Sequence, residues 1–233
     1  MKFSVLMSVY KNEKGIWLDR AIRSIWDDQL VKPSEIVLVE DGPLTPDLYS
    51  VIGGWEAKLG SLLTIVKIDV NVGLGEALNR GLARCSYDLV ARMDSDDVSV
   101  PERFRVQLKH ICEGFDVVGG FVSEGPDPDL AGFSVRRVPL SHDDIVKSSK
   151  FRCPLNHPTV FFRKEAVLDA GGYMPMKSFE DYYLWLRMLG LGKRISNIDM
   201  ILVRMRVDSG LYTRRSGVAY MLSELRFFCI LRQ

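Results

Sequence analysis

Three carboxylates occupy the four positions Asp94-Ser95-Asp96-Asp97, directly after the largely apolar run 87–93. Like charges this close repel, so such a cluster usually needs a compensating cation. Mn²⁺ or Mg²⁺ would suit it, because these ions prefer oxygen ligands and keep coordination positions open for phosphate oxygens. In an extended backbone Asp94 and Asp96 share a face and could hold one ion. The alternative is a solvated acidic loop that caps the next helix.

Alternating strands and helices are expected to position this cluster. Apolar runs predict strands over 3–9, 35–40, 62–69 and 89–93, and helical spacing of apolar residues predicts helices over 16–26 and 74–82. Strands and helices that alternate at this spacing predict right-handed β-α-β units. We therefore expect a single α/β domain with a mainly parallel central sheet flanked by helices.

The second half of the chain gives weaker signals. Ser99 and Glu102 have capping-box spacing at the start of a helix. Proline and glycine between Ser123 and Leu140 indicate a loop or hairpin. Further elements are predicted as strands over 115–121 and 159–162 and helices over 164–170, 180–189 and 218–231, the last of them amphipathic.

Polar or aromatic residues stand at three successive strand ends. These are Ser8-Val9-Tyr10, Glu40-Asp41 and the Asp94–Asp97 cluster. Ligands of open α/β sheets bind outside the carboxyl ends of the strands. Tyr10 could stack on a base, and Asp41 could accept a hydrogen bond from a ring N–H or a ribose hydroxyl. The recurrence favours a nucleotide site over ordinary turns.

The glycine-rich segment 71–76 is a possible phosphate contact. It resembles a dinucleotide fingerprint, but Leu78 stands where the third glycine should be. The N-terminus of the following helix could still receive a phosphate near Gly75. A flexible turn is the alternative.

Two further sites have both a catalytic and a structural interpretation. In Phe179-Glu180-Asp181-Tyr182 one carboxylate could be a general base, but Ser178 and Asp181 also have capping-box spacing. His157 follows a proline-containing loop before a strand, where it could contact a substrate or serve the fold.

The C-terminal part is basic on a chain whose formal net charge is only +1. From Arg187 onward Lys and Arg outnumber acids, and Arg204, Arg206, Arg214 and Arg215 could bind a diphosphate or a membrane face. The alternative is a solvated basic surface. The overall charge gives no reason to expect nucleic-acid binding. Four widely spaced cysteines, no apolar run of membrane-spanning length and no signal peptide predict a cytoplasmic protein.

Read in order, these segments resemble the bacterial family 2 glycosyltransferases, whose fold is of the GT-A type. The resemblance rests on the opening 4–13, Glu40-Asp41-Gly42, the segments 71–79 and 91–103, Asn156-His157-Pro158, and Glu180-Asp181-Tyr182 with Leu184-Trp185. It implies a donor half over 1–120 and an acceptor half over 121–233. It implies an inverting, metal-dependent transfer of one sugar from a nucleotide-diphospho-sugar, with UDP-hexose expected from family frequency.

The resemblance also implies residue roles. The donor-binding set is Ser8, Val9, Tyr10, Glu13, Asp41, Asn71, Gly75, Asn79, Arg92, Asp94 and Asp96. The metal set is Asp96 with Asp94 or Asp97, and Asp208 could replace a histidine that relatives carry. Asp181 becomes the expected base, with Glu180 as the fallback. His157 and the four arginines 204, 206, 214 and 215 would contact the acceptor.

Within the family, the His157 loop and the basic end resemble enzymes of O-antigen or exopolysaccharide assembly. Their acceptors are lipid-diphosphate-linked sugars, so peripheral contact with the cytoplasmic face of the inner membrane is expected. Two alternatives remain open from the sequence. One is a sugar-phosphate nucleotidyltransferase, although no glycine-rich loop directly follows the first strand. The other is a non-catalytic nucleotide-sugar or polysaccharide-binding module.

Overall fold

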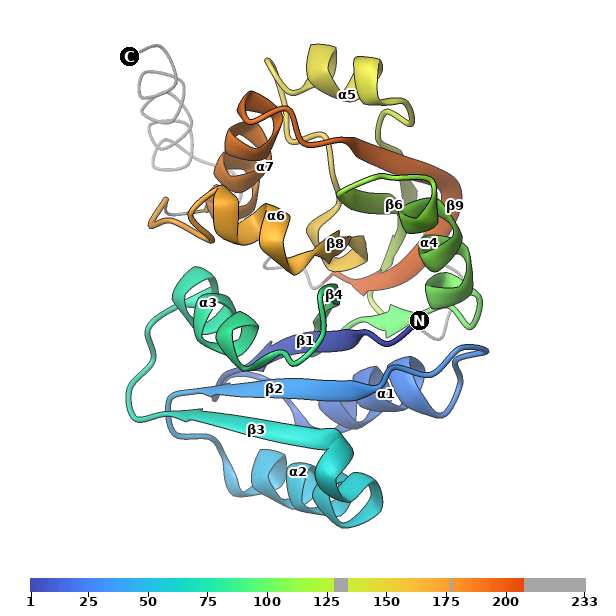
Figure 1. The fold of residues 1–233 in the computed structure, drawn as a ribbon. Coiled ribbons are helices and arrows are strands. Elements are labelled where there is room, and N and C mark those ends of the chain that lie inside the picture. Colours follow the sequence, from blue (N-terminus) through green and yellow to red (C-terminus); the bar gives the residue numbers. More distant parts are fainter. Residues whose placement is uncertain (128–133, 177, 208–233) are drawn as a thin grey trace.

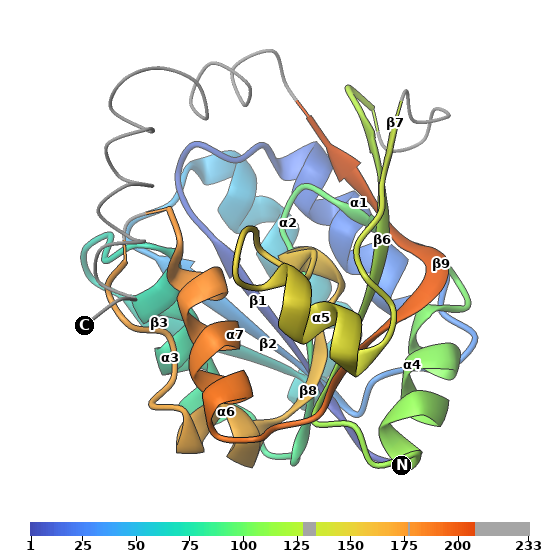
Figure 2. The same ribbon diagram turned by 90° about the horizontal axis from the view of Figure 1, so that it is seen from above.

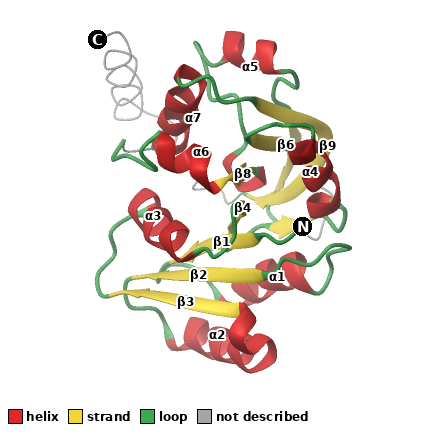
Figure 3. Cartoon of the chain, viewed as in Figure 1, coloured by secondary structure: helices red, strands yellow, loops and turns green. Residues whose placement is uncertain are grey.

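The structure is a computed structural model and describes residues 1–127, 134–176 and 178–207 (Figure 1). Its first part alternates strands and helices (Figure 3). The elements are β1 (Ser4–Val9), α1 (Gly15–Trp26), β2 (Glu35–Asp41), α2 (Pro46–Leu59), η1 (Gly60–Leu62), β3 (Leu63–Ile68), α3 (Leu74–Arg84) and β4 (Leu89–Asp94). All four strands pair in parallel, in the order β3-β2-β1-β4. The predicted β-α-β arrangement is confirmed.

The second part continues the same sheet. Its elements are β5 (Val98–Ser99), α4 (Arg103–Cys112), β6 (Val117–Gly125), β7 (Ser134–Arg136), α5 (His142–Ser148), η2 (His157–Thr159), β8 (Phe161–Arg163), α6 (Lys164–Asp169), α7 (Glu180–Gly190) and β9 (Ile195–Arg206). Here β8 is antiparallel to β4 and β6, and β9 is parallel to β6. This half therefore adds antiparallel pairs to the parallel N-terminal strands.

Both faces of the sheet are covered, as predicted. Strand β1 shows why, since Val5 and Met7 belong to one apolar cluster and Leu6 to the other. Helices α1, α2 and α4 pack on the first face, and α3, α6 and α7 on the second (Figure 2). Within the described residues, no helix is long and apolar enough to cross a bilayer.

Some local predictions were wrong. Helix α2 and strand β9 were not predicted, although Thr45 caps α2 by accepting a hydrogen bond from the Leu48 N–H. The predicted Ser99 capping box does not form, because Ser99 lies in β5 and its hydroxyl accepts a hydrogen bond from Gln29. The strand predicted over 159–162 begins two residues late, at Phe161, because Thr159 ends a 3₁₀ turn.

Other local predictions are confirmed. The segment after Ser123 contains the antiparallel pair β6–β7. Helix α6 is followed by Gly171 and Gly172, both with positive φ, a conformation that glycine adopts without strain. The predicted helix over 218–231 lies outside the described residues.

Candidate active site

The predicted strand ends meet at one edge of the sheet. Ser8 lies opposite Asp94 in the β1–β4 pair, and Val9 lies opposite Glu40 in the β1–β2 pair. Tyr10 follows β1 and is 43% exposed. The carboxyl ends of three strands distant in sequence therefore meet here, as the parallel order requires.

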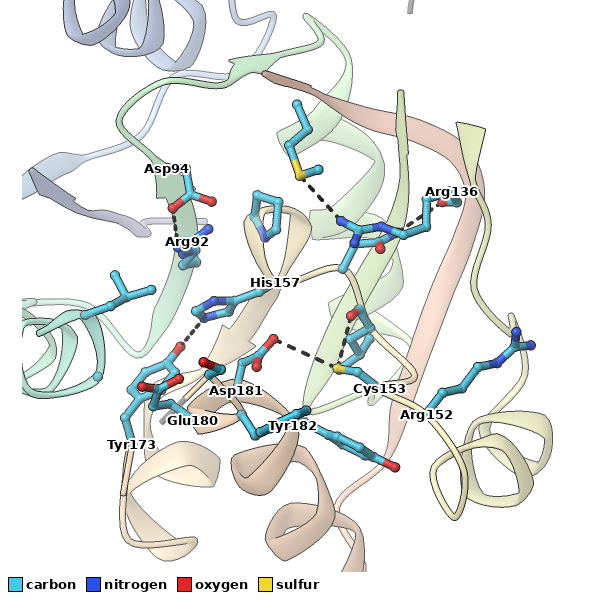
Figure 4. A pocket seen from close by; sticks show the side chains of 18 of the residues that line it. Arg92, Asp94, Arg136, Arg152, Cys153, His157, Tyr173, Glu180, Asp181 and Tyr182 are labelled. Atoms are coloured by element: carbon cyan, nitrogen blue, oxygen red, sulfur yellow. Dashed lines mark hydrogen bonds and ion pairs between the residues drawn. The ribbon is translucent and has the colours of Figure 1, made fainter. Parts of the chain in front are cut away.

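Arg92 and Asp94 form an ion pair at the end of β4 (Figure 4). The two residues are two positions apart in a strand, so their side chains share a face. The Arg92 side chain is 2% exposed, and its Nε and Nη1 atoms have no hydrogen-bond partner among the described residues. Two donor groups of this buried guanidinium are therefore left without a partner among the described residues, and its positive charge lies at the cavity wall.

The acidic cluster bends away from the strand. Strand β4 ends at Asp94, and Ser95 and Asp96 form a turn, so the expected extended alternation to Asp96 was wrong. Asp96 accepts a hydrogen bond of 2.8 Å from Arg206 Nη2. Burial, followed by repulsion from Asp94 and Glu13, raises the pKa of Asp96 to about 7.

Asp97 lies behind this turn with 1% of its surface exposed. Its Oδ1 accepts a hydrogen bond of 2.9 Å from the Arg206 backbone N–H, and its Oδ2 has no partner among the described residues. Burial, followed by Asp94 and Asp96, raises the pKa of Asp97 well above its usual range. The crowded carboxylates and the unpartnered oxygen fit a nearby cation.

The arrangement does not form a closed metal site. Among residues 1–127, 134–176 and 178–207, no three His, Cys, Asp or Glu side chains come together as a metal-binding group. Asp94 and Asp96 could supply two carboxylates, and a bound ion would need further oxygens from a ligand.

Asp41 has a structural role that the sequence did not indicate. It is 4% exposed, and its carboxylate accepts hydrogen bonds from Asn71 Nδ2 and from the backbone N–H groups of Val72 and Gly73. These bonds fix the glycine-rich loop at the N-terminus of α3. Asp41 and Asn71 therefore shape this edge of the sheet, and their contact with a donor stays a prediction.

A cavity of about 530 Å³ joins this edge to the second acidic segment. Its wall includes Arg92 and Asp94 on one side and Glu180 and Asp181 on the other (Figure 4). Gly75 and His157 also line it. Residues from α3, β4, η2 and α7 thus share one pocket. The structure brings together groups that lie almost ninety positions apart in the sequence.

The two acids of α7 differ in their surroundings. The helix begins at Glu180, and its N-cap is Phe179, so the predicted capping box of Ser178 and Asp181 is out of register by one residue. Burial raises the pKa of Glu180, while hydrogen bonds from backbone N–H groups of Ser178 and Glu180 oppose the rise. Glu180 therefore serves the helix N-terminus, whereas the Asp181 carboxylate lies 3.9 Å from the thiol of Cys153 in the cavity wall.

His157 belongs to a buried hydrogen-bonded group. Its Nε2 lies 2.9 Å from the Tyr173 hydroxyl, and Asn79 binds both the N–H and the carbonyl of Tyr173. Burial, followed by the charge of Arg92, lowers the pKa of His157 well below its usual value. Asn79 thus positions the cavity wall, and its expected contact with a donor stays a prediction.

The predicted acceptor arginines do not line the cavity in the part of the chain that the structure describes. Arg204 is exposed on β9, and Arg206 is bound to Asp96 and lies 3.9 Å from Glu13. Arg214, Arg215 and Asp208 lie outside the described residues. Instead, the cavity contains Arg136 and Arg152, which sequence reasoning missed because neither belongs to a recognisable pattern.

Tyr173 and Cys153 were also missed. Tyr173 directly follows the predicted helix-ending glycines, and Cys153 opens the loop that carries His157. Only their closeness to residues already singled out could have indicated them.

Comparison with known proteins agrees with this geometry. Residues 4–172 match the family model described as glycosyl transferase family 2. The amylovoran biosynthesis glycosyltransferase AmsE of Erwinia amylovora is 39% identical over 97% of this chain and 84% of its own length. An Escherichia coli UDP-Gal:alpha-D-GlcNAc-diphosphoundecaprenol beta-1,3-galactosyltransferase is 39% identical over 97% of this chain and 81% of its own.

Among solved structures, TarS 1-349 of S. aureus in complex with UDP-GlcNAc superposes with a TM-score of 0.73. The match has 22% identity and covers 99% of this chain but 66% of that one, so it supports the fold alone. The family model covers well over half of the chain, and two relatives exceed 30% identity over nearly all of it. The chain therefore belongs to glycosyltransferase family 2 and is a glycosyltransferase with a GT-A fold.

Proposed function

We propose that this enzyme transfers one sugar from a nucleotide-diphospho-sugar, with UDP-hexose as the first candidate, to a hydroxyl of a lipid-diphosphate-linked sugar. The transfer inverts the anomeric centre and forms a β-glycoside. The product would serve O-antigen or exopolysaccharide assembly at the cytoplasmic face of the inner membrane. Family membership argues against the nucleotidyltransferase and the non-catalytic module.

One observation carries this proposal: a single cavity connects Asp94 at the strand edge with Asp181 at the start of α7. A donor bound across the ends of β1, β2 and β4 would place its sugar in this cavity. An acceptor entering from the opposite side would then meet Asp181. The donor half expected over 1–120 would then include Arg92 and Asp94, and the acceptor half expected over 121–233 would include His157 and Asp181.

The reaction needs a base and a stabilised leaving group. As the acceptor hydroxyl oxygen attacks the anomeric carbon, Asp181 takes its proton, and the bond from that carbon to the diphosphate breaks. Attack from the face opposite the leaving group inverts the configuration. Arg92 lies on the donor side, where its unpartnered donors can bind the negative charge of the diphosphate.

Asp94 and Asp96 would hold Mn²⁺ or Mg²⁺, with the buried Asp97 behind them. When bound, such an ion supplies Lewis-acid stabilisation of the leaving diphosphate. The pKa of Asp96, raised by burial and then by repulsion from Asp94 and Glu13, and the unpartnered oxygen of Asp97 support this assignment, because a bound cation would offset both costs.

The relatives support the acceptor class. The name of the Escherichia coli relative gives a sugar-diphospholipid as its acceptor, and AmsE is named for the biosynthesis of amylovoran. An acceptor of this kind would bring the enzyme to the membrane surface.

The test is a panel of UDP-, GDP- and dTDP-sugars with Mn²⁺, scored first by protection against thermal unfolding. Donors that raise the melting temperature are then incubated with a short-chain sugar-diphosphate lipid, and the product linkage is read by NMR. A β-linked product supports the proposal. An α-linked product, or binding without transfer to any acceptor, would contradict it.

A further inference from the structure

The cavity has a second basic end, away from the donor side. Arg136 on β7 and Arg152 after α5 both line it, and Figure 4 shows them on the side opposite Arg92 and Asp94, with Asp181 between. Neither arginine takes part in the proposed chemistry. Their position raises the question of which anion they bind.

Contacts with Glu124 and Asn156 hold Arg136 in place. Its Nε lies 3.3 Å from Glu124 Oε1, and Asn156 Nδ2 donates a hydrogen bond to its carbonyl oxygen. Its Nη2 contacts the thioether of Met205, which is a weak acceptor. Among the described residues, the outer edge of the guanidinium thus keeps hydrogen-bonding capacity for a ligand.

Arg136 and the proposed base both act on one residue of the cavity wall, Cys153. The Cys153 thiol is 3.9 Å from Asp181 Oδ2, and the charge of Arg136 acts on the same thiol. Cys153 therefore interacts with both the proposed base and this guanidinium. When the hydroxyl of an acceptor sugar reaches Asp181, the group attached to the other side of that sugar would extend toward Arg136.

Arg152 and Phe151 form the outer part of this end. Arg152 is exposed, and its Nε donates a hydrogen bond of 3.2 Å to Ser148 Oγ. Phe151 is 77% exposed although it lines the same cavity. A cation and an exposed aromatic ring that line the same cavity match a ligand that is anionic at one point and apolar at another.

We propose that Arg136 and Arg152 form the subsite for the diphosphate of the lipid-linked acceptor, and that Phe151 contacts the start of its apolar chain. Guanidinium groups bind phosphate oxygens in bidentate fashion, and two of them match the charge of a diphosphate diester. This inference rests on the proposed function for its acceptor class. It assigns the diphosphate to residues other than Arg204 and Arg206, because those two arginines do not line this cavity.

The test is calorimetric titration of the full chain saturated with UDP, which keeps the donor site filled. One probe is the diphosphate ester of α-D-GlcNAc with a decyl chain, and the other is decyl α-D-GlcNAc without phosphate. We expect Arg136→Gln and Arg152→Gln each to weaken binding of the diphosphate probe about tenfold and to leave the neutral probe nearly unchanged. Arg137→Gln is the matched control, because Arg137 is exposed next to Arg136 and lies over the ring of Phe121.

A third probe with a methyl group in place of the decyl chain isolates Phe151. Phe151→Ser should weaken the decyl diphosphate and leave the methyl diphosphate unchanged. Unchanged binding of the diphosphate probe to both arginine variants, or an equal loss for the neutral probe, would overturn the subsite. Arg152 is exposed, so its variant should fold even if loss of the Glu124 partner unfolds Arg136→Gln.

Sugar transfer to the same probes separates the two proposals. Equal rates of sugar transfer to the probes with and without the diphosphate would contradict the subsite but not the proposed function. If binding depends on the phosphate and on Arg136 and Arg152, but no donor sugar is transferred, the proposed function is contradicted and the subsite is supported.

Discussion

Arg206 donates a hydrogen bond of 2.8 Å to Asp96, which links the last residue of β9 to the acidic turn after β4. The backbone N–H of Arg206 also binds Asp97. Strand β9 reaches this turn because it pairs with β6 along its length and with β5 through Arg204 and Val203. The acidic turn is therefore neutralised in part by a residue more than a hundred positions away, and sequence spacing gave no sign of it.

The first prediction concerns the metal. Asp96→Asn should abolish the Mn²⁺ dependence of donor binding and lower transfer by at least about a hundredfold, because charge stabilisation by a bound ion contributes several kcal/mol. Donor affinity is measured by calorimetry with and without Mn²⁺. The control is Asp88→Asn, since Asp88 is exposed just before the other end of β4. Retained Mn²⁺ dependence in Asp96→Asn would exclude Asp96 as a ligand.

The second prediction distinguishes the two acids of α7. Asp181→Asn should lower kcat by about 10²–10⁴-fold, the usual contribution of a general base, with donor affinity unchanged. Glu180→Gln should act mainly on stability, because its carboxylate accepts hydrogen bonds from backbone N–H groups at the helix N-terminus. Initial rates at saturating donor and thermal unfolding separate the effects. A larger kcat loss in Glu180→Gln would reverse the assignment.

Much of the first half of the fold could be predicted from the sequence. Strands β1 to β4 are largely apolar, and their common edge follows from the parallel connections. Helix α2 was missed because its apolar residues are interrupted by Gly53 and Gly54, which usually signal a turn. Its start was nevertheless marked by Thr45 and Pro46.

The candidate site could be predicted only in part. Asp94 and Asp181 were identified because acidic clusters stand out in a sequence, and the structure places both in one cavity. Arg136 and Arg152 carry no such signal, because an isolated arginine in a loop or hairpin is usually a solvated charge. Their role depends on how β7 and the segment after α5 fold over the cavity, which local patterns do not encode.

The third prediction concerns the contact between α3 and the cavity wall. Asn79→Ala removes both hydrogen bonds to the Tyr173 backbone, so unfolding free energy should fall by about 1–3 kcal/mol. The kcat should fall as well, since Tyr173 holds His157 in the wall. Arg80→Ala on the same helix is the control, because its ion pair with Glu76 is exposed. Equal stability of the two variants would contradict a positioning role for Asn79.

The fourth prediction follows from the buried His157. Burial and Arg92 lower its pKa in the folded state, so below about pH 6.5 the unfolded chain takes up a proton that the folded chain does not. This residue therefore makes the free energy of unfolding fall as the pH drops below about 6.5. In His157→Asn this contribution to the loss of unfolding free energy at low pH should disappear, even if overall stability is lower. Urea unfolding at several pH values measures the slope, and His110→Asn, which removes the surface partner of Glu113, is the control. Parallel slopes for wild type and His157→Asn would show that His157 is protonated in the folded enzyme.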